Sequence, residues 1–443
     1  MRVHKNGFAV TITLAAVFLC GAVFFMWGKG QVTAGTDEVY KNMEILAEVM
    51  RHIEKNYVEP QKPKDLIYGA IKGMVQALDP HSAFMTKEEH QELMMETKGT
   101  FTGIGIEITI RDKVLTVVSP IEGTPAFEAG LKAADRIIKI EDKSTKDMSL
   151  MEAVKLIRGP KGTKVLLTIA REGEEKPLQF TIVRDVIPLI SVRHYLLTPD
   201  MGYVRISNFQ SKTSGDLSEN LSTLEKGRDL KGLVLDLRNN PGGLLAQAIE
   251  VSEMFLDSGI IVSTKARESA QNIVATAHPN KVPRNYPIVV LVNGGTASAA
   301  EIVAGALQDN KKALILGTRT FGKGSVQTIL PLSDGAGLRL TTARYYTPNG
   351  RSIQLDGIVP DIELDFVPPP EKDEKAGRHV LREADLERAM PKENKERQSG
   401  ESGKLNETDE RVKNLIEKDN QVRQALQLLQ SWSIFSRMKD GSL

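Results

Sequence analysis

The stretch that decides the fold lies at residues 287–327 and reads PIVVLVNGGTASAAEIVAGALQDNKKALILGTRTFGKGSVQ. An apolar run from Ile288 to Val292 leads into a turn of small residues, and Ser298 opens a segment of helical spacing behind it. A second apolar run leads to Lys323, which stands between two glycines. Continuous apolar runs of this length are typical of strands buried on both faces. The stretch therefore predicts an α/β core.

A related arrangement occurs upstream. Gly232 to Leu237 is a continuous apolar run, a loop ending in two glycines follows, and Leu244 to Leu256 has the spacing of an amphipathic helix. The two stretches together indicate one α/β region with strands, glycine loops and helices in alternation. The other strands predicted for this region are residues 202–206, 260–264, 338–346, 362–364 and a short one around Ile353.

Ser298 and Lys323 are the candidate catalytic pair. Ser298 begins a helix, whose N-terminal N–H groups favour negative charge beside the hydroxyl, although serine at such a position is also a routine helix cap. Lys323 follows a buried strand, where burial penalises the charged amine and lowers its pKa toward the range of a general base. Gln327 shares a face with Lys323 in an extended segment, so its amide can hold the amine. The three residues predict a Ser/Lys dyad, an established form of serine acyl-transfer chemistry.

Two backbone amides are candidates for the oxyanion hole of such a site. Gly243 opens the helix after the upstream buried strand, and Ala299 follows Ser298 directly. N–H groups from two helix starts can converge on one developing negative charge. We therefore expect Gly243 and Ala299 to hold the oxyanion.

The segment 317–324 also resembles a phosphate-binding loop. It reads GTRTFGKG and matches the pattern GxxxxGK. A phosphate loop requires Ser or Thr after the lysine and a helix behind it. Gly324 stands at that position, and residues 325–330 have the pattern of a strand. The sequence therefore disfavours a nucleotide hydrolase.

The composition limits the classes of function. The 443 residues are too many for one ordinary domain, and 58 basic against 57 acidic residues produce no global field that points to nucleic acid. The single cysteine, Cys20, excludes an intrachain disulfide, and no histidine has metal-ligand spacing. We expect no metal, no cofactor and no nucleic-acid partner.

The N-terminal segment contains an apolar run, Gly7 to Trp27, without a charged residue. Such a run is long enough to cross a bilayer, and Arg2 and Lys5 in front of it predict a cytoplasmic N-terminus. We expect residues 1–34 to be a single-pass anchor in the lipid of the inner (cytoplasmic) membrane, with the body in the periplasm. The alternative is a signal peptide cleaved near residues 32–34, which leaves a periplasmic protein.

The next two regions have different patterns of apolar residues. Residues 35–98 have helical spacing with two proline interruptions and predict an N-terminal helical arm. Residues 99–187 have the alternating pattern of short strands. Near the start of the latter, the successive N–H groups of a glycine turn can form an anion-binding nest, and a strand edge beside them can add an extended peptide. The residues of this turn are Gly103, Ile104, Gly105 and Ile106.

Residues 99–187 resemble a PDZ domain over the whole region. The resemblance implies that Gly103 to Ile106 bind the C-terminal carboxylate of a peptide. One departure occurs at Ala133-Ala134-Asp135, where the family usually has glycine before the aspartate. That departure concerns the local turn more than the fold.

Several motifs together resemble the carboxyl-terminal processing peptidases, also called tail-specific proteases. The matching segments are TASAAEI at 296–302, GKGSVQ at 322–327, RNNPGG at 238–243, LDPHS at 78–82 and the PDZ-like region. The resemblance covers residues 40–366. It implies a Ser/Lys endopeptidase in which Gln327 assists the lysine and the PDZ domain captures substrate C-termini.

The same resemblance implies the architecture. Residues 188–367 are expected to form an α/β core with a crotonase-like ββα arrangement, into which the mainly-β PDZ domain is inserted. Arg158, in the RGPKGT turn, is a candidate for coupling the PDZ domain to activity, against the alternative of an ordinary surface arginine. Residues 368–443 are expected to form a charged flexible tail, in which helical spacing returns from Asp419 to Phe435.

Two classes of function follow. The first is an exported, membrane-anchored serine endopeptidase that acts on protein or peptide substrates with accessible C-terminal tails. The second is a non-catalytic, PDZ-containing adaptor or sensor at the membrane, which requires Gly103 to Ile106 but does not require Ser298, Lys323 and Gln327 together. The helical arm and the C-terminal helix are candidate surfaces for a homo-oligomer or for an activating partner protein.

Overall fold

The computed structural model describes residues 34–111, 113–368 and 407–439. The predicted membrane segment, Gly7 to Trp27, lies outside these residues. Within the described ranges, no helix is both long and apolar enough to cross a membrane. The chain divides into two compact units, Met1–Phe84 and Met85–Leu443.

The first unit contains two of the predicted helices, α2 (Ala34–Asn56) and α3 (Pro63–Gln76). Pro63 stands in the first turn of α3, where its missing N–H costs no hydrogen bond. The turn after α3 is organised by Asp79, whose carboxylate accepts hydrogen bonds from the N–H groups of His81 and Ser82, each at 2.8 Å. The LDPHS motif is therefore a side-chain-stabilised turn. A short strand, β1 (Ala83–Met85), follows it.

The second unit begins with helix α4 (Lys87–Lys98). Thr86 and Glu89 form a reciprocal capping box at its start. Gly99 ends the helix in a left-handed conformation, with a φ of 75°. The helix thus has both of the end signals that a sequence can encode.

Residues 100–188 form the small β domain that the alternating pattern predicts. Strand β2 (Thr100–Gly103) pairs with β9 (Asp185–Pro188), so the two ends of the domain lie together. The main sheet has the order β3-β4-β5-β7-β8, and β6 pairs with β5. Its elements are β3 (Ile106–Arg111), β4 (Val114–Pro120), α5 (Pro125–Glu128), β5 (Arg136–Ile140), β6 (Lys143–Ser144), α6 (Leu150–Ile157), β7 (Lys164–Ala170) and β8 (Leu178–Val183). The last two strands, β8 and β9, are additions to the elements expected from the sequence.

The departure at Ala133-Ala134-Asp135 has a structural cost. Ala134 has a φ of 67°, in the left-handed region that glycine adopts without strain. Its N–H nevertheless donates to the carbonyl of Val117 at 2.9 Å, and Asp135 accepts two hydrogen bonds from the Arg171 guanidinium, each at 2.8 Å. The turn is therefore kept in place by its neighbours although it lacks the glycine.

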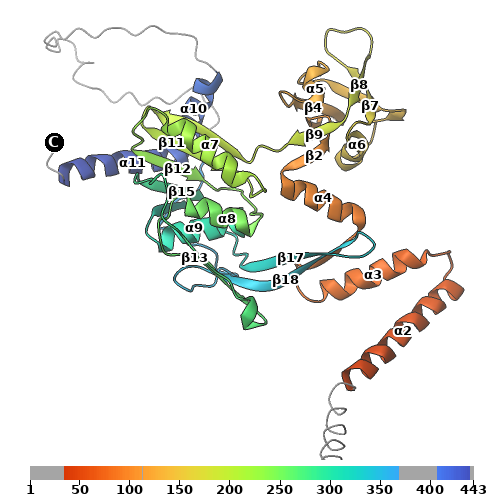
Figure 1. Ribbon diagram of the computed structural model, residues 1–443. Coiled ribbons are helices and arrows are strands. Elements are labelled where there is room, and N and C mark those ends of the chain that lie inside the picture. The colour runs from red at the N-terminus through yellow and green to blue at the C-terminus, as the bar shows by residue number, and fades with distance from the viewer. Residues whose placement is uncertain (1–33, 112, 369–406, 440–443) are drawn as a thin grey trace, which may run out of the picture. The chain divides into compact units, whose positions relative to one another are not determined.

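The α/β core is built on a mixed six-stranded sheet (Figure 1). Strand β10 is antiparallel to β11, and every later pair in the sheet is parallel. The strands, in spatial order, are β10 (Val192–Thr198), β11 (Met201–Ile206), β12 (Gly232–Asp236), β15 (Ile288–Val292), β16 (Ala313–Gly317) and β19 (Ile362–Glu363).

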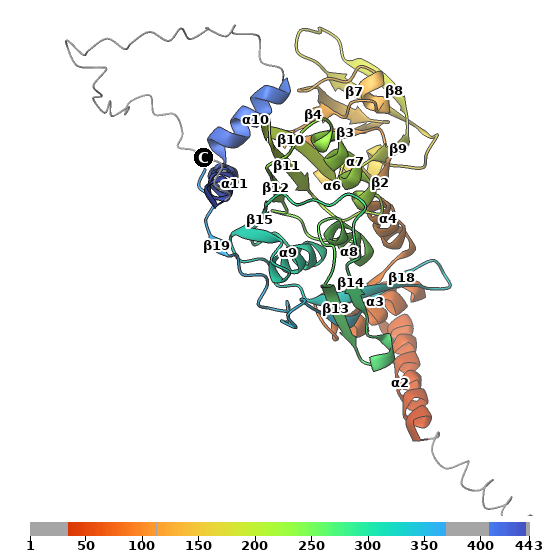
Figure 2. The same cartoon turned by 60° about the vertical axis from the view of Figure 1, so that its left-hand side comes forward.

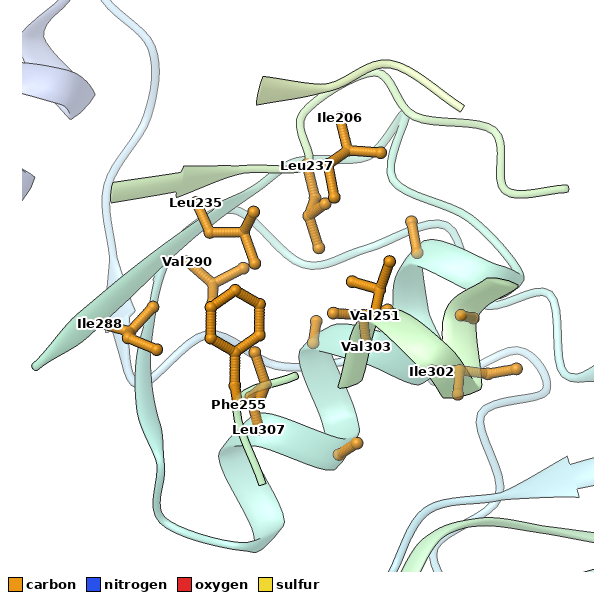
Figure 3. Close-up of a cluster of buried hydrophobic side chains, with 14 of the residues drawn as sticks. Ile206, Leu235, Leu237, Val251, Phe255, Ile288, Val290, Ile302, Val303 and Leu307 are labelled. Atoms are coloured by element: carbon orange, nitrogen blue, oxygen red, sulfur yellow. The ribbon is translucent and has the colours of Figure 1, made fainter. Parts of the chain in front are cut away.

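Helices cover both faces of this sheet (Figure 2). Helices α7 (Thr213–Glu225), α8 (Leu245–Glu253) and α9 (Ala299–Asp309) pack on one face, and α11 (Asn420–Lys439) packs on the other. Leu235 and Val290 point toward the first group in Figure 3, whereas Val234 and Val289 belong to the cluster under α11. This alternation explains the continuous apolar runs, because both faces of each strand are buried.

A second sheet carries the lysine segment. Strand β17 (Ser325–Pro331) pairs with β18 (Gly337–Tyr346), which pairs with β13 (Ile260–Ala266), and β13 pairs with β14 (Val274–Thr276). The short 3₁₀ helix η1 (Ser269–Gln271) connects β13 and β14. The short strand predicted around Ile353 is replaced by a single bridge between Ser352 and Tyr346.

The C-terminal helices are α10 (Glu407–Lys418) and α11. Val422, Ala425 and Leu429 are buried against the sheet, so α11 docks on the α/β core. Trp432, which shares that pattern, is 61% exposed. The predicted charged flexible tail, 368–443, lies outside the described residues from 369 to 406, and α10 and α11 occupy most of the rest of it.

Candidate active site

Ser298 occupies a strained turn between β15 and α9. Its backbone has φ 55° and ψ −115°, a conformation that costs a residue with a side chain on the order of 1–3 kcal/mol. The side chain is 7% exposed. The turn that precedes it, Asn293 to Ala297, is tied by hydrogen bonds from Asn293 N–H to Thr296 Oγ1 and from Thr296 Oγ1 to the carbonyl of Leu237. The small residues noted in the sequence thus permit a sharp turn that presents one hydroxyl.

Glu301 links the turn that carries Ser298, here called the serine turn, to the loop between β16 and β17 that carries Lys323, here called the lysine loop. Its side chain is fully buried, and its carboxylate accepts the N–H of Ser298 at 2.8 Å. The same carboxylate accepts the N–H groups of Gly322 and Lys323 at 2.7 and 2.9 Å, and the hydroxyl of Thr320 at 2.5 Å. A buried carboxylate requires donors of this kind, because burial without them is costly. Sequence reasoning missed this role, although the S-x-x-E spacing is a signal for a helix-start contact.

Lys323 and Gln327 contact each other as predicted from their spacing. Lys323 Nζ donates to Gln327 Oε1 at 3.0 Å. Gly322 has a φ of 88°, and a Cβ at Gly324 would lie 2.4 Å from the backbone nitrogen of Gln354. The two glycines are therefore required by the backbone conformation and by close packing around the lysine.

The RNNPGG loop lies against the serine turn. A Cβ at Gly242 would lie 2.8 Å from Ser298 Cβ and 2.9 Å from the nitrogen of Ala299. Gly243 has a φ of 142°, and a Cβ there would lie 2.2 Å from the carbonyl oxygen of Phe209. The structure thus brings together the two segments that carry Gly243 and Ala299. Ala299 is the first residue of α9, and the N–H of a first helical residue has no acceptor within its own helix.

Tyr345, on β18, is a member of the site that the sequence did not indicate. Its hydroxyl lies 3.3 Å from Ser298 Oγ, and its N–H donates to the carbonyl of Gly324 at 2.8 Å. The residue is 4% exposed, and burial raises the pKa of its phenol. A tyrosine within a strand carries no local signal, because only the pairing of distant segments places it beside Ser298.

A cleft of about 310 Å³ joins these residues. Ser298, Lys323 and Gln327 all line it, together with Gly243 and Tyr345. Among the described residues, Asn208 Oδ1 and Ser325 Oγ are buried polar atoms of this cleft without a hydrogen-bond partner. The other lining residues are Leu93, Glu96, Thr97, Phe209, Gln210, Pro241, Gly242, Leu244, Leu245, Val326, Ile329 and Arg339. The surface of the cleft is more apolar than polar.

A buried ion-pair network holds the start of the RNNPGG loop in place. Asp236, at the end of β12, is fully buried and accepts hydrogen bonds from Arg238 Nη2 at 2.7 Å and from the Tyr203 hydroxyl at 2.7 Å. Burial opposes ionisation of this carboxyl, but Arg238 and Arg205 hold its pKa below the ordinary value. Arg238 also donates to Asp419 Oδ2 at 2.8 Å, which connects the loop to the start of α11.

The glycine turn of the β domain lies at the start of its edge strand. Ile104 is buried and Gly105 has a φ of 79°, where a Cβ would lie 2.3 Å from Thr124 Oγ1. Ile106 begins β3, the end strand of its sheet. Arg158, at the end of α6, places its guanidinium over the Phe101 ring on β2, 5.3 Å from the ring centre. Among the described residues, β3 thus has a strand partner on one side only, β4.

Three family models match the chain. Residues 200–364 match peptidase family S41, and residues 116–171 match a PDZ domain. Residues 28–89 match the "Activating protease CtpB N-terminal domain". The matches follow the division into a helical N-terminal region, a β domain and an α/β core.

Relatives extend this similarity over most of the chain. The carboxy-terminal-processing protease of Bartonella bacilliformis is 45% identical over 82% of this chain and 84% of its own length. The carboxy-terminal processing protease CtpA of Bacillus subtilis is 38% identical over 82% of this chain and 78% of its own. A solved structure, the photosystem II D1 C-terminal processing protease, is 32% identical over 72% of this chain and 92% of its own, with a TM-score of 0.43.

These identities show the class first: the chain is a serine-type peptidase with the S41 peptidase fold, a PDZ domain and a helical N-terminal region. It belongs to the carboxy-terminal processing proteases of peptidase family S41. The predicted family and enzyme class are confirmed, and they favour the peptidase over the non-catalytic adaptor. The roles of individual residues are a separate question.

Proposed function

We propose that Ser298 is the nucleophile of this peptidase and that Lys323 is its general base. The observation that carries the proposal is the single cleft that Ser298, Lys323 and Gln327 line, with Glu301 bound to the backbone on both sides. The strained backbone of Ser298 also supports it, because strain of this kind is concentrated at functional sites. The membership of a serine peptidase family agrees with these roles.

The reaction follows the order of serine acyl transfer. Ser298 Oγ attacks the peptide carbonyl carbon while its proton passes to the neutral amine of Lys323, and the carbonyl electrons move onto oxygen. The N–H groups of Gly243 and Ala299 stabilise that oxyanion. The peptide C–N bond then breaks, and Lys323 returns the proton to the leaving nitrogen. Water hydrolyses the resulting ester with Lys323 again as base.

Gln327 and the unpartnered polar atoms complete the site. The Gln327 carbonyl accepts from Lys323 Nζ, which positions the amine without adding a negative charge that would favour its protonated form. Asn208 Oδ1 and Ser325 Oγ are available to the amide groups of an extended substrate. The apolar lining of the cleft favours substrates with apolar side chains near the cleaved bond.

Two variants test the dyad. Ser298→Ala and Lys323→Ala should each abolish cleavage of an unfolded protein such as β-casein, while circular dichroism and the melting temperature stay near those of the wild type. The rate of the wild type should also fall on the acid side of neutrality as Lys323 becomes protonated. Full activity of Ser298→Ala, or a flat profile down to about pH 5, would exclude these roles.

The PDZ domain captures the C-terminal carboxylate of the substrate through Gly103, Ile104, Gly105 and Ile106. The left-handed Gly105 and the free edge of β3 support this role. A peptide with a free carboxylate and its amidated twin, which differ only at the C-terminus, test it. The free acid should bind and be cleaved better. Equal binding of both peptides would contradict carboxylate capture.

Arg158 couples the PDZ domain to the peptidase activity. Its guanidinium packs on Phe101 of β2, the strand that connects α4 to the β domain. Arg158→Ala should change activity on tailed substrates, and Lys155→Ala on the same helix serves as the surface control. If the two variants behave alike, Arg158 is an ordinary surface arginine.

The chain is exported and anchored in the inner membrane by residues 1–34, with the body in the periplasm, and a cleaved signal peptide is the alternative. The uncharged run Gly7 to Trp27 behind basic residues supports this location. Fractionation of cells that express residues 1–443 or 35–443 distinguishes the cases, because an anchor keeps only the longer chain with the membrane. The helical arm and α11 are proposed surfaces for a homo-oligomer or an activating partner, to be tested by light scattering of each truncation.

A further inference from the structure

Tyr345 connects the two halves of the proposed dyad. Its hydroxyl lies 3.3 Å from Ser298 Oγ, and its backbone N–H donates to the carbonyl of Gly324, the residue after Lys323. Strand β18 carries it, and the neighbouring residues Arg344 and Ala343 pair with Ser325 and Val326 of the lysine strand. One residue therefore fixes a phenol at the serine and the backbone beside the lysine.

The position of the hydroxyl is not explained by packing. Tyr345 belongs to the main apolar cluster of the core and is 4% exposed. A phenylalanine of the same shape would fill this space without the cost of burying a hydroxyl. The phenolic oxygen instead lies within hydrogen-bond distance of Ser298 Oγ, the proposed nucleophilic atom. The hydroxyl therefore points to a role in chemistry.

We propose that Tyr345 is a positioning residue that donates its phenolic hydrogen bond to Ser298 Oγ and so directs the serine proton toward Lys323. This inference rests on the proposed Ser/Lys dyad. Each hydroxyl has one hydrogen, so when the phenol donates, the serine hydrogen is left for another acceptor. Lys323 in its neutral form, on the same cleft, is that acceptor.

The phenol keeps its proton throughout the reaction. As Ser298 Oγ attacks, its own proton passes to Lys323, and the Tyr345 hydrogen bond stabilises the negative charge that grows on Oγ before the new C–O bond is complete. Burial raises the pKa of the Tyr345 phenol, so it remains a donor at neutral pH. When the acyl-enzyme is hydrolysed, Oγ leaves as the same charged species, and the same donor assists.

The experiment compares Tyr345→Phe with Tyr346→Phe in the full chain. Tyr346 is the next residue of the same strand, and its ring lies under Lys265 Nζ, 4.4 Å from the ring centre. Successive side chains of a strand point to opposite faces, so Tyr346→Phe removes an equivalent hydroxyl away from Ser298. Cleavage of β-casein gives the activity, and the rate of labelling by a fluorophosphonate probe gives the reactivity of Ser298 itself.

Tyr345→Phe should lower the turnover number and the labelling rate together by about tenfold, the value of one hydrogen bond, with little change in KM. The acid limb of the pH profile should stay in place, because Lys323 keeps its surroundings. The melting temperature of Tyr345→Phe should match that of Tyr346→Phe. If the phenylalanine variant is unstable, a protein with 3-fluorotyrosine at position 345 replaces it in the test. This residue is a stronger donor of nearly the same size, so the protein should cleave at no less than the wild-type rate.

Two results would overturn the inference. One is a Tyr345→Phe protein that labels and cleaves like Tyr346→Phe. The other is a loss of activity accompanied by a displaced acid limb, which would place the effect on the lysine. Failure of the dyad itself gives a different result, because Ser298→Ala would then remain active and the wild type would carry no label on Ser298.

Discussion

Ser298 and Lys323 are held in place by different means. Every residue from Ala299 to Leu307 is buried, so the helix behind the serine is fixed by packing between the sheet and α8. The strand after the lysine, β17, has one buried residue, and its other residues are half-buried or exposed; it pairs with β18 on one side. Lys323 itself is half-buried and is positioned by hydrogen bonds to Glu301 and Gln327.

Because Ser298 and Lys323 are held by different interactions, mutations near the serine and mutations near the lysine should have different effects. Burial is non-directional and supplies the stability of the core, whereas hydrogen bonds are directional and supply position. Changes in the packed helix behind Ser298 should therefore affect folding as well as activity. Changes around Lys323 and Gln327 should affect activity with little loss of stability. Four variants, in order of decreasing effect, test this contrast.

Glu301→Gln should have the largest effect, because Glu301 holds both the backbone of Ser298 and the backbone of Lys323. An amide offers one oxygen where the carboxylate now accepts four hydrogen bonds, and its NH₂ group would face N–H donors. We expect activity to fall by about 100-fold or more and the free energy of unfolding to fall by about 3 kcal/mol. Urea unfolding and casein cleavage measure the two quantities.

Glu268→Gln is the control for this change, because Glu268 is exposed. It should change the free energy of unfolding by less than about 0.5 kcal/mol. If Glu301→Gln were as harmless, the buried carboxylate would not be the link between the serine turn and the lysine loop.

Gly243→Ala should act on the serine half alone. The added Cβ would lie 2.2 Å from the Phe209 carbonyl oxygen, so the loop must move and carry the Gly243 N–H away from Ser298. Loss of one oxyanion donor predicts a fall of about 100-fold in kcat. Gly215→Ala, in an exposed helical position with open space around it, should leave kcat unchanged and stabilise the protein by up to about 1 kcal/mol. Equal kcat values for the two variants would remove Gly243 from the oxyanion hole.

Gln327→Ala should act on the lysine half alone. It removes the acceptor 3.0 Å from Lys323 Nζ, and we expect kcat to fall by about tenfold with an unchanged melting temperature. Gln327→Glu sharpens the test, because a carboxylate favours the protonated amine and raises the lysine pKa. The acid limb of its pH profile should therefore move to higher pH. A limb that stays in place would mean that the titrating base is not Lys323.

Arg205→Met should have the smallest effect, confined to stability. Arg205 lies 3.4 Å from Asp236 and contributes to the lowered pKa of that carboxyl. A lowered pKa stabilises the fold above the unfolded-state value, about pH 4, and this contribution is lost as the pH falls through the folded-state pKa. The wild type should therefore exceed Arg205→Met by about 1 kcal/mol near neutrality, and the advantage should shrink below about pH 4. An advantage that is constant from pH 7 to 3 would exclude this linkage.

Local patterns accounted for most of the fold. The apolar runs of β12, β15 and β16, the helical spacing of α8 and α9 and the alternating strands of the PDZ domain all lie where the sequence predicts them. The strands outside the prediction include β1, β6, β8, β9, β10 and β14, which are short or carry polar residues between their apolar ones. Such segments become strands because a neighbouring strand supplies their hydrogen bonds, which is a property of the pairing and not of the segment.

The class of protein, the buried strands and the residues Ser298, Lys323 and Gln327 of the cleft could be predicted from the sequence, because each has a local signal in its spacing, its flanking glycines or its apolar neighbours. The contacts of Glu301, of Tyr345 and of the Arg238–Asp419 pair came from the tertiary structure. Apart from the Ser298 N–H, which is three positions from Glu301, the partners of these residues are 19 to 181 positions apart in the chain. Hydrogen bonds of that kind depend on where packing places two segments, and no local pattern encodes that placement.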